Sequence, residues 1–193
     1  MKMKREVGRG DHGEPFEALL RSAQAGSPRS WEQVFTWLSP AVAGYLRMQG
    51  ARDVDDLTSE VFLGVFRGIR GFRGTEAAFR SWVFVIAHHR IVDERRHTAR
   101  SAAETVELQD SQGEPARSSE DDAIDSLATA RLGELCDRLA TDQRDVLMLR
   151  ITGDLTVEQV AEVLGKSAGA VKQLQRRGLE ALRRILSHEG VPL

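Results

Sequence analysis

Four carboxylates lie close together in residues 53–60, DVDDLTSE: Asp53, Asp55, Asp56 and Glu60. Clustered carboxylates bind Mg²⁺ in nucleases, so one hypothesis is a catalytic metal site. Three of the four fall within one helical turn and point in different directions, and neither a histidine nor a second carboxylate cluster is nearby. The pattern therefore favours acidic residues in the first turn of a helix, where they suit the helix dipole.

Other residue types that commonly carry chemistry are sparse. The single cysteine, Cys136, cannot form an internal disulfide and lacks the neighbours of a zinc site, so we expect a small buried residue. The adjacent His88 and His89 would project about 100° apart on a helix, which is unsuitable for holding one metal ion. We therefore predict no enzymatic activity, no metal and no cofactor.

The C-terminal part carries the most informative spacing. Thr156 and Gln159 are spaced as a capping box, which predicts that a helix begins there. Gly165 supplies a residue able to adopt positive φ, and Ala161 and Val171 provide the small and apolar contacts that two crossing helices need. The spacing predicts a helix-turn-helix.

The second helix of this motif is basic on one side. Residues 166–186 contain six basic residues against one acid, Glu180, a net +5, although the 193-residue chain has a formal net charge of -2. A basic run is usually a solvated helix face. The capping, the glycine and the one-sided charge together favour insertion into a DNA major groove.

The elements that would position these residues are helices. Apolar residues recur at helical spacing over residues 16–38, a separate short helix is expected at residues 42–46, and no β-type alternation is present. Residues 101–126 contain eight acids against one arginine, a net −7, with hardly any large apolar side chains. We predict an all-α fold of two small helical domains joined by a flexible acidic linker. The expected divisions are 1–14 (disordered tail), 15–100 (first domain), 101–126 (linker) and 127–193 (helix-turn-helix domain).

The composition also restricts where the protein acts. No window approaches the roughly 20 apolar residues that span a bilayer, and no apolar run follows the charged N-terminus. We therefore predict a cytoplasmic protein without membrane insertion.

Two segments together resemble one known family. Residues 141–186, TDQRDVLMLRITGDLTVEQVAEVLGKSAGAVKQLQRRGLEALRRIL, resemble the promoter −35-binding domain of bacterial RNA polymerase sigma factors of the extracytoplasmic-function group. Residues 53–97, DVDDLTSEVFLGVFRGIRGFRGTEAAFRSWVFVIAHHRIVDERRH, resemble the group's other domain, which binds core RNA polymerase and opens the −10 element. With the helices before them, these segments cover nearly the whole chain apart from the tail and linker.

The resemblance implies three sites. The docking surface for core polymerase would comprise Asp55, Asp56, Leu57, Glu60 and Phe62. The −10 element would be contacted by Phe72, Arg73, Arg80, Trp82, His88, His89, Arg90, Arg95 and Arg96. The −35 element would be contacted by Arg150, Ser167, Ala168, Lys172, Gln173, Arg176 and Arg177. Trp82 is also a candidate for the core, and His88-His89 departs from the family's pattern, in which a basic residue and Asn are common.

The interpretation is an initiation factor that binds core RNA polymerase and promoter DNA, contacts the −35 element and melts the −10 element. The resemblance also implies an anti-sigma factor as partner and a monomer when the chain is free. A different class stays open: a one-component helix-turn-helix regulator that binds paired half-sites as a dimer. A metal-dependent nuclease is the third hypothesis.

Overall fold

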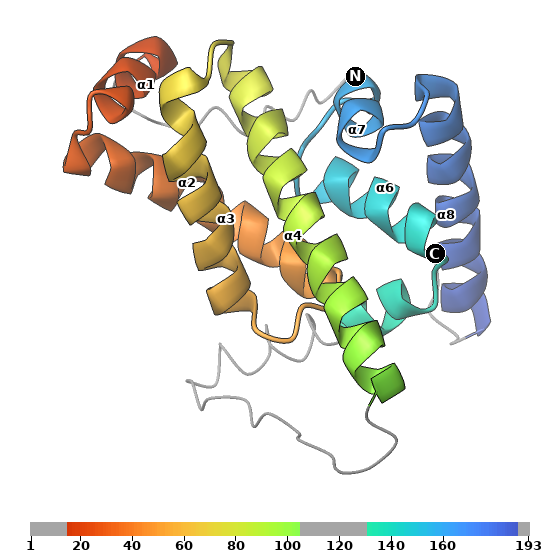
Figure 1. Cartoon of the computed structure of the whole chain (residues 1–193). Coiled ribbons are helices and arrows are strands. Elements are labelled where there is room, and N and C mark those ends of the chain that lie inside the picture. Colours follow the sequence, from red (N-terminus) through yellow and green to blue (C-terminus); the bar gives the residue numbers. More distant parts are fainter. Residues whose placement is uncertain (1–14, 105–130, 189–193) are drawn as a thin grey trace, which may run out of the picture.

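The computed structural model describes residues 15–104 and 131–188, and within these ranges it contains helices and no strands, as the sequence predicts (Figure 1). The elements are α1 (Phe16–Gln24), α2 (Pro28–Met48), α3 (Val54–Gly68), the 3₁₀ turn η1 (Ile69–Gly71), α4 (Glu76–Glu104), α6 (Thr141–Ile151), α7 (Val157–Leu164) and α8 (Ala168–His188). The predicted tail, 1–14, lies outside the described residues. Among the described helices, none has the length and hydropathy of a membrane span.

In the N-terminal half, local signals place the helix starts. The Ser27 side chain accepts from the Ser30 backbone N–H ahead of α2, and the Asp53 carboxylate accepts from the Asp56 N–H at 2.9 Å ahead of α3. Both side chains satisfy backbone donors that a helix start leaves unpaired. Asp53 is therefore an N-cap and its carboxylate is already engaged.

The predicted break before residues 42–46 is wrong, because α2 continues through Pro40 as one helix of 21 residues. Proline inside a helix removes one backbone hydrogen bond and disfavours the geometry. Here the apolar residues on both sides of it, Leu38 and Val42, are fully buried, as are Tyr45 and Leu46. Burial of this continuous face outweighs the local preference of the proline.

The longest helix, α4, extends past the predicted domain boundary. It runs to Glu104, so the first four residues of the predicted linker, 101–104, are helical. The remainder of the predicted linker, 105–126, lies outside the described residues.

The C-terminal half contains the predicted helix-turn-helix. The Thr156 hydroxyl accepts from the Gln159 N–H at 3.2 Å, and the Gln159 side chain accepts from the Thr156 N–H at 2.8 Å, which completes the capping box of α7. The helix ends at Gly165, whose φ of +61° is the left-handed conformation. The Ser167 hydroxyl accepts from the Ala170 N–H at 3.2 Å at the start of α8.

Helix α4 lies between the two halves of the molecule (Figure 1). On one side it packs against α2 and α3, and on the other against α7; α2 also contacts α6. Helix α8 packs against α6 and α7 and forms the outer surface of the C-terminal half. The N-terminal half, α1 to α4, and the C-terminal half, α6 to α8, are therefore in direct contact.

The left-handed turn generates a stability prediction. Gly165→Ala should lower the free energy of unfolding of the C-terminal half by about 1 kcal/mol, because a Cβ disfavours positive φ. Gly169→Ala is the matched control, since Gly169 lies in α8 and a Cβ added there would meet no atom closer than 4.0 Å. Thermal or urea unfolding of both variants tests this, and equal stability of the two would contradict it.

Candidate protein-docking and nucleic-acid surfaces

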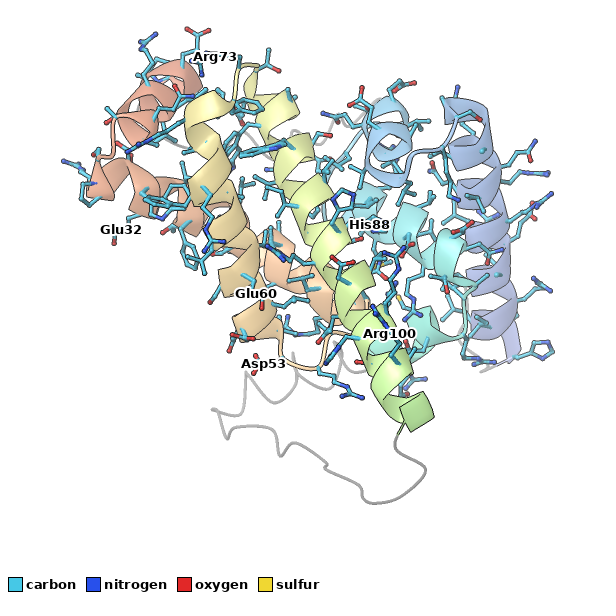
Figure 2. All side chains as sticks on the ribbon, in the orientation of Figure 1. Glu32, Asp53, Glu60, Arg73, His88 and Arg100 are labelled. Atoms are coloured by element: carbon cyan, nitrogen blue, oxygen red, sulfur yellow. The ribbon has the colours of Figure 1, made fainter. Side chains whose placement is uncertain are left out.

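The predicted docking residues separate into exposed acids and buried apolar side chains. Asp55, Asp56 and Glu60 are exposed on α3, whereas Leu57 and Phe62 are only 7% and 4% exposed. Leu57 and Phe62 therefore belong mainly to the core, and a partner cannot use them as its principal apolar contacts. The acids form a solvent-facing rim on α3. Figure 2 labels Glu60 of this rim and Asp53, the N-cap that precedes α3.

Exposed apolar side chains lie next to the predicted docking residues. Phe35 of α2 and Leu63 and Phe66 of α3 are 41%, 53% and 52% exposed. With Trp31 and the edge of Phe62 they line a hollow of about 430 Å³. Sequence reasoning missed Leu63 and Phe66. The available signal was their position, because both are large apolar residues that fall outside the buried stripe of α3.

An aromatic cluster supports the loop that precedes α4. The ring of Phe72 lies 5.3 Å from that of Trp82 and 5.1 Å from that of Phe79. Gly68 makes room for Trp82, because a Cβ at this position would lie 2.7 Å from the indole. Trp82 is partly buried against the core, so the expectation of a core residue holds in part, and its contact with the −10 element stays a prediction.

The loop backbone is also held by a polar contact. The Gln24 side chain of α1 donates to the carbonyls of Ile69 and Phe72 at 2.8 and 2.9 Å. Arg73 extends from the loop into solvent and donates to the carbonyls of Arg70 and Phe72. Gln24 was not among the predicted residues, since nothing in the sequence connects α1 with this loop.

The predicted −10 cations do not form one free surface. His89 and Arg96 are exposed, and Arg96 lies 3.4 Å from Asp93 on the same helix. Arg90 lies 3.8 Å from Glu60 of α3, so a residue predicted for the −10 element is paired with one predicted for polymerase docking. Such half-exposed pairs contribute little to stability and exchange partners readily.

Two further residues of this set, Arg80 and Arg95, face other parts of the protein. The guanidinium of Arg80 lies 5.5 Å from the ring of Trp37 and donates to the Gly153 carbonyl at 3.4 Å. Arg95 donates to the Gln49 carbonyl at 2.7 Å and lies 3.6 Å from the Asp145 carboxylate. Gly153 and Asp145 belong to the C-terminal half.

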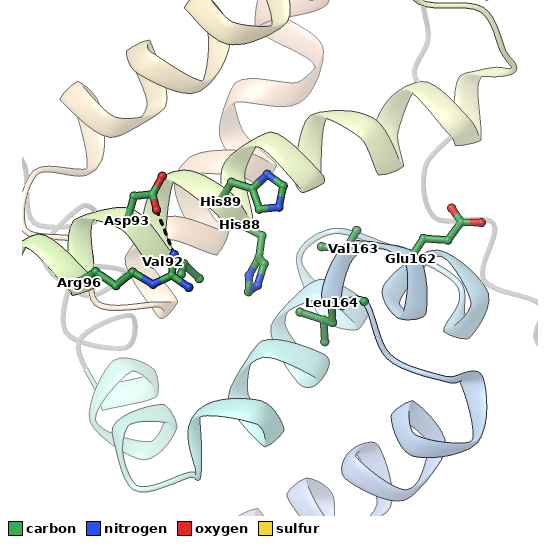
Figure 3. Close-up of a pocket in the computed structure, with 9 residues that line it drawn as sticks. His88, His89, Val92, Asp93, Arg96, Glu162, Val163 and Leu164 are labelled. Atoms are coloured by element: carbon green, nitrogen blue, oxygen red, sulfur yellow. Dashed lines mark hydrogen bonds and ion pairs between the residues drawn. The ribbon is translucent and has the colours of Figure 1, made fainter.

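A buried polar cluster therefore joins α2, α4 and α6. Tyr45 is fully buried, and its hydroxyl lies 2.9 Å from Nδ1 of His88. His88 leaves α4 toward the C-terminal half, as Figures 2 and 3 show. Asp145 of α6 is 6% exposed. Sequence reasoning did not single out Asp145, because an acid among apolar residues carries no signal of its partner.

Burial controls protonation in this cluster. It raises the pKa of Tyr45 well above 10.0, so the hydroxyl that is hydrogen-bonded to Nδ1 of His88 stays protonated. Burial also lowers the pKa of His88 below 6.5, and this outweighs the opposing effect of the Asp145 carboxylate. The pKa of Asp145 is raised above 3.8 by burial, against the effects of His88 and Arg95. The charged or titratable groups around His88 are Tyr45, Asp145, His89, Arg95 and Lys166.

The helix-turn-helix presents a basic face to solvent. Lys172, Gln173, Arg176 and Arg177 are exposed on α8, and Arg176 makes only an exposed pair with Glu180 at 3.8 Å. Their opposite face is buried: Val171 is fully buried, and a Cβ on Gly178 would lie 2.8 Å from Leu147 of α6.

The other predicted −35 residues have different surroundings. Ser167 is exposed and Ala168 is half-buried at the start of α8, next to the cap. Arg150 is half-buried, and its guanidinium donates to the Leu155 carbonyl, which holds the loop between α6 and α7. Among the described residues, no three His, Cys, Asp or Glu side chains are grouped as metal ligands.

Comparisons with known families match both halves. The family Sigma-70 region 2 matches residues 35–101, and the family Sigma-70, region 4 matches residues 136–184. The ECF RNA polymerase sigma factor ShbA of Streptomyces griseus is 30% identical, covering 92% of this chain and 98% of its own length. The ECF RNA polymerase sigma factor BldN of Streptomyces coelicolor is 34% identical. The matched region covers 87% of this chain and 64% of the length of BldN.

A solved structure has the same fold. It contains the sigma factor RpoE in complex with the anti-sigma factor NepR from Bartonella quintana, with a TM-score of 0.65 and 18% identity over 82% of this chain and 98% of that chain. The fold, the basic face of α8 and the two matched regions define a two-part, helix-turn-helix transcription factor. The chain belongs to the family of ECF RNA polymerase sigma factors and is a promoter-directing initiation factor.

The half-buried histidine generates a pH prediction. Because the folded chain favours neutral His88, the stability that this residue contributes is present above pH 6.5 and is lost as the pH falls through its lowered pKa. His88→Gln keeps a side chain able to hydrogen-bond with Tyr45 but does not titrate, so its unfolding free energy should fall less between about pH 7.5 and about pH 5.5. Urea unfolding across this range tests it. The exposed His97→Gln is the control, and a slope for His88→Gln equal to that of the control would contradict the prediction.

Proposed function

We propose that this initiation factor uses three separate surfaces: the acidic and apolar surface of α2 and α3 for core RNA polymerase, the α4 face for the −10 element, and α8 for the −35 element. The observation that carries the proposal is the one-sided basic face of α8, exposed at Lys172, Gln173, Arg176 and Arg177 on a capped helix-turn-helix. A major-groove helix needs this combination of a rigid back face and a polar, cationic front.

The docking surface suits a basic, amphipathic helical partner. The exposed acids Asp55, Asp56 and Glu60 lie along α3, and Leu63 and Phe66 provide apolar area on the same helix. Complementary charge accelerates encounter and fixes orientation, while buried apolar contacts supply most of the affinity. A coiled coil on the largest polymerase subunit, the partner implied by the family resemblance, has the required chemistry.

The α4 face suits DNA whose strands are being separated. Arginines bind phosphates, and aromatic side chains receive unstacked bases. Arg80, Arg90, Arg95 and Arg96 supply the charge, and the Phe72–Trp82 pair lies at the loop end of the helix. We infer that Gln24 positions this loop through its two hydrogen bonds to the backbone.

The remaining parts of the proposal concern partners and location. We infer a protein without catalysis of its own that acts in the cytoplasm, is monomeric when free, and is inhibited by an anti-sigma factor. Support for the last point is the complex of RpoE with NepR, which has the same fold as this chain. The dimeric one-component regulator is not favoured, because the chain matches both sigma regions in order.

The docking proposal predicts a loss of polymerase binding. Asp56→Arg and Leu63→Asp should each weaken binding to core polymerase at least about tenfold, the first by charge repulsion and the second by introducing a charge into an apolar contact. Both side chains are exposed, so the variants should fold; Asp56→Arg should lose only about 0.3–1 kcal/mol of stability, because it places a positive charge in the first turn of α3. Competition for core polymerase measures the effect, with Glu17→Arg on α1 as the exposed charge-reversal control. Wild-type affinity for both variants would exclude this surface.

The α8 proposal predicts distinct effects at bases and phosphates. Alanine at Arg177 or Gln173, assigned to bases, should cost about 1–3 kcal/mol and relax preference at the contacted position. Alanine at Lys172 or Arg176, assigned to phosphates, should weaken all promoters alike and reduce the salt dependence. Reconstituted holoenzyme is assayed on promoters that differ only in the −35 element, at two salt concentrations. Arg29→Ala is the control, and unchanged transcription by the Lys172, Arg176 and Arg177 triple alanine variant would rule out α8.

A further inference from the structure

The loop that carries Phe72 and Arg73 is held by a side chain from a helix that lies outside both matched family regions. Gln24 is the last residue of α1, and its Nε2 donates to the carbonyls of Ile69 and Phe72, which are 45 and 48 residues away in the chain. These residues are the first residue of η1 and its C-cap. One amide group of α1 therefore holds both ends of the turn from which Phe72 projects.

The orientation of the Gln24 amide follows from its partners. A carbonyl oxygen can only accept, so both N–H groups of Nε2 point at the loop and Oε1 points away from it. The side chain is half-buried, and the loop uses both of its donors. The contact is therefore specific to a side chain with two donors, and a carboxylate or an apolar group of the same length could not make it.

Helix α1 is itself fixed, so the position of Gln24 is well defined. Three of its apolar residues are buried, and the ring of Phe16 lies 5.6 Å from that of Phe79. The Phe79 ring lies in turn 5.1 Å from that of Phe72. Helix α1 therefore supports the loop in two ways, through ring packing beneath Phe72 and through hydrogen bonds to the loop backbone.

The peptide group between Phe72 and Arg73 connects two groups with different tasks. Its carbonyl accepts from Gln24 at 2.9 Å and from the Arg73 guanidinium at 2.7 Å. The Phe72 ring approaches Gly74 closely, since a Cβ at position 74 would lie 3.0 Å from Cζ of the ring. Aromatic rings receive unstacked bases, and guanidinium groups bind phosphates. A rotation of this one peptide plane would therefore displace the base-binding and phosphate-binding groups together.

We propose that Gln24 is a positioning residue that determines specificity: by fixing the peptide group between Phe72 and Arg73, it sets which base of the −10 element the loop accepts. The role of Gln24 rests on the proposed contact of this loop with the −10 element and adds selectivity to it. Selective recognition requires binding groups to be held within about 0.5 Å of the productive geometry. Attraction between a guanidinium and phosphates changes only slowly with distance. Loss of the two hydrogen bonds should therefore reduce base discrimination more than overall DNA affinity.

The test uses substitutions of similar length. Gln24→Met removes both donors, whereas Gln24→Lys keeps a donor group that can reach the same carbonyls. Holoenzyme reconstituted with each variant is assayed for transcription on promoters that differ by one base at a time in the −10 element. Gln24→Met should lower discrimination at one position about tenfold, as expected for two lost hydrogen bonds, and leave discrimination in the −35 element unchanged. Gln24→Lys should restore most of the loss.

Gln33→Met is the matched control. Gln33 is a half-buried glutamine of α2, and within residues 15–104 and 131–188 its side chain makes no hydrogen bond. This variant should discriminate like the unaltered chain. Amide hydrogen exchange of the free chain provides a readout without DNA: the Phe72 N–H, which donates to the Ile69 carbonyl at 3.1 Å, should exchange faster in Gln24→Met than in Gln33→Met. Both variants should bind core polymerase like the unaltered chain.

The outcomes separate the role of Gln24 from the function on which it rests. Phe72→Leu keeps an apolar side chain and removes the aromatic surface, so it should lose discrimination at the same −10 position. If it does and Gln24→Met keeps full discrimination, the role of Gln24 is overturned and the −10 assignment stands. Unchanged exchange of the loop, an equal fall in transcription on every promoter, or no restoration by Gln24→Lys would also overturn this role. Unchanged discrimination by Phe72→Leu at every −10 position would overturn the assignment of the loop and the role of Gln24 together.

Discussion

The interaction on which the rest of this structure depends is the burial of one face of α4 against α2 and α3. Phe79, Val83, Phe84, Ala87 and Ile91 are all fully buried, and each large apolar side chain of this kind stabilises the fold by about 1.5–3 kcal/mol. Their burial fixes the helix against α2 and α3. The remaining faces of the same helix carry the arginines and histidines, whose direction is therefore set by the core.

This arrangement explains why the functional side chains lie on a rigid element. The Phe72–Trp82 contact and the close approach of Trp82 to Gly68 attach the loop before α4 to the core, and Gln24 holds the loop backbone. Side chains fixed in this way lose little conformational entropy when a ligand binds.

Charge separation along the chain also follows from the division of surfaces. The formal net charge of -2 combines an acidic segment at residues 101–126 and an acidic rim on α3 with basic residues on α4 and α8. Where the acids and bases meet in the fold, they pair: Glu60 with Arg90, and Asp145 with Arg95. Acids and bases from different segments of the chain therefore form ion pairs, which the net charge alone does not reveal.

Local features follow from the amino-acid sequence alone. Helical periodicity, the Thr156–Gln159 capping box, the glycine at position 165 and the basic face of α8 depend on residues within one or two turns of each other, so they are predictable from spacing. The order of two family-typical segments likewise identified the class of protein.

Features that depend on distant partners arise only in the tertiary structure. Packing buries Leu57 and Phe62 and exposes Leu63 and Phe66, because which α3 face is covered depends on where α2 lies. It carries α2 through Pro40, since long-range burial outweighs a local preference. It also places Asp145 against Arg95, where only the contact between the two halves gives the carboxylate a partner.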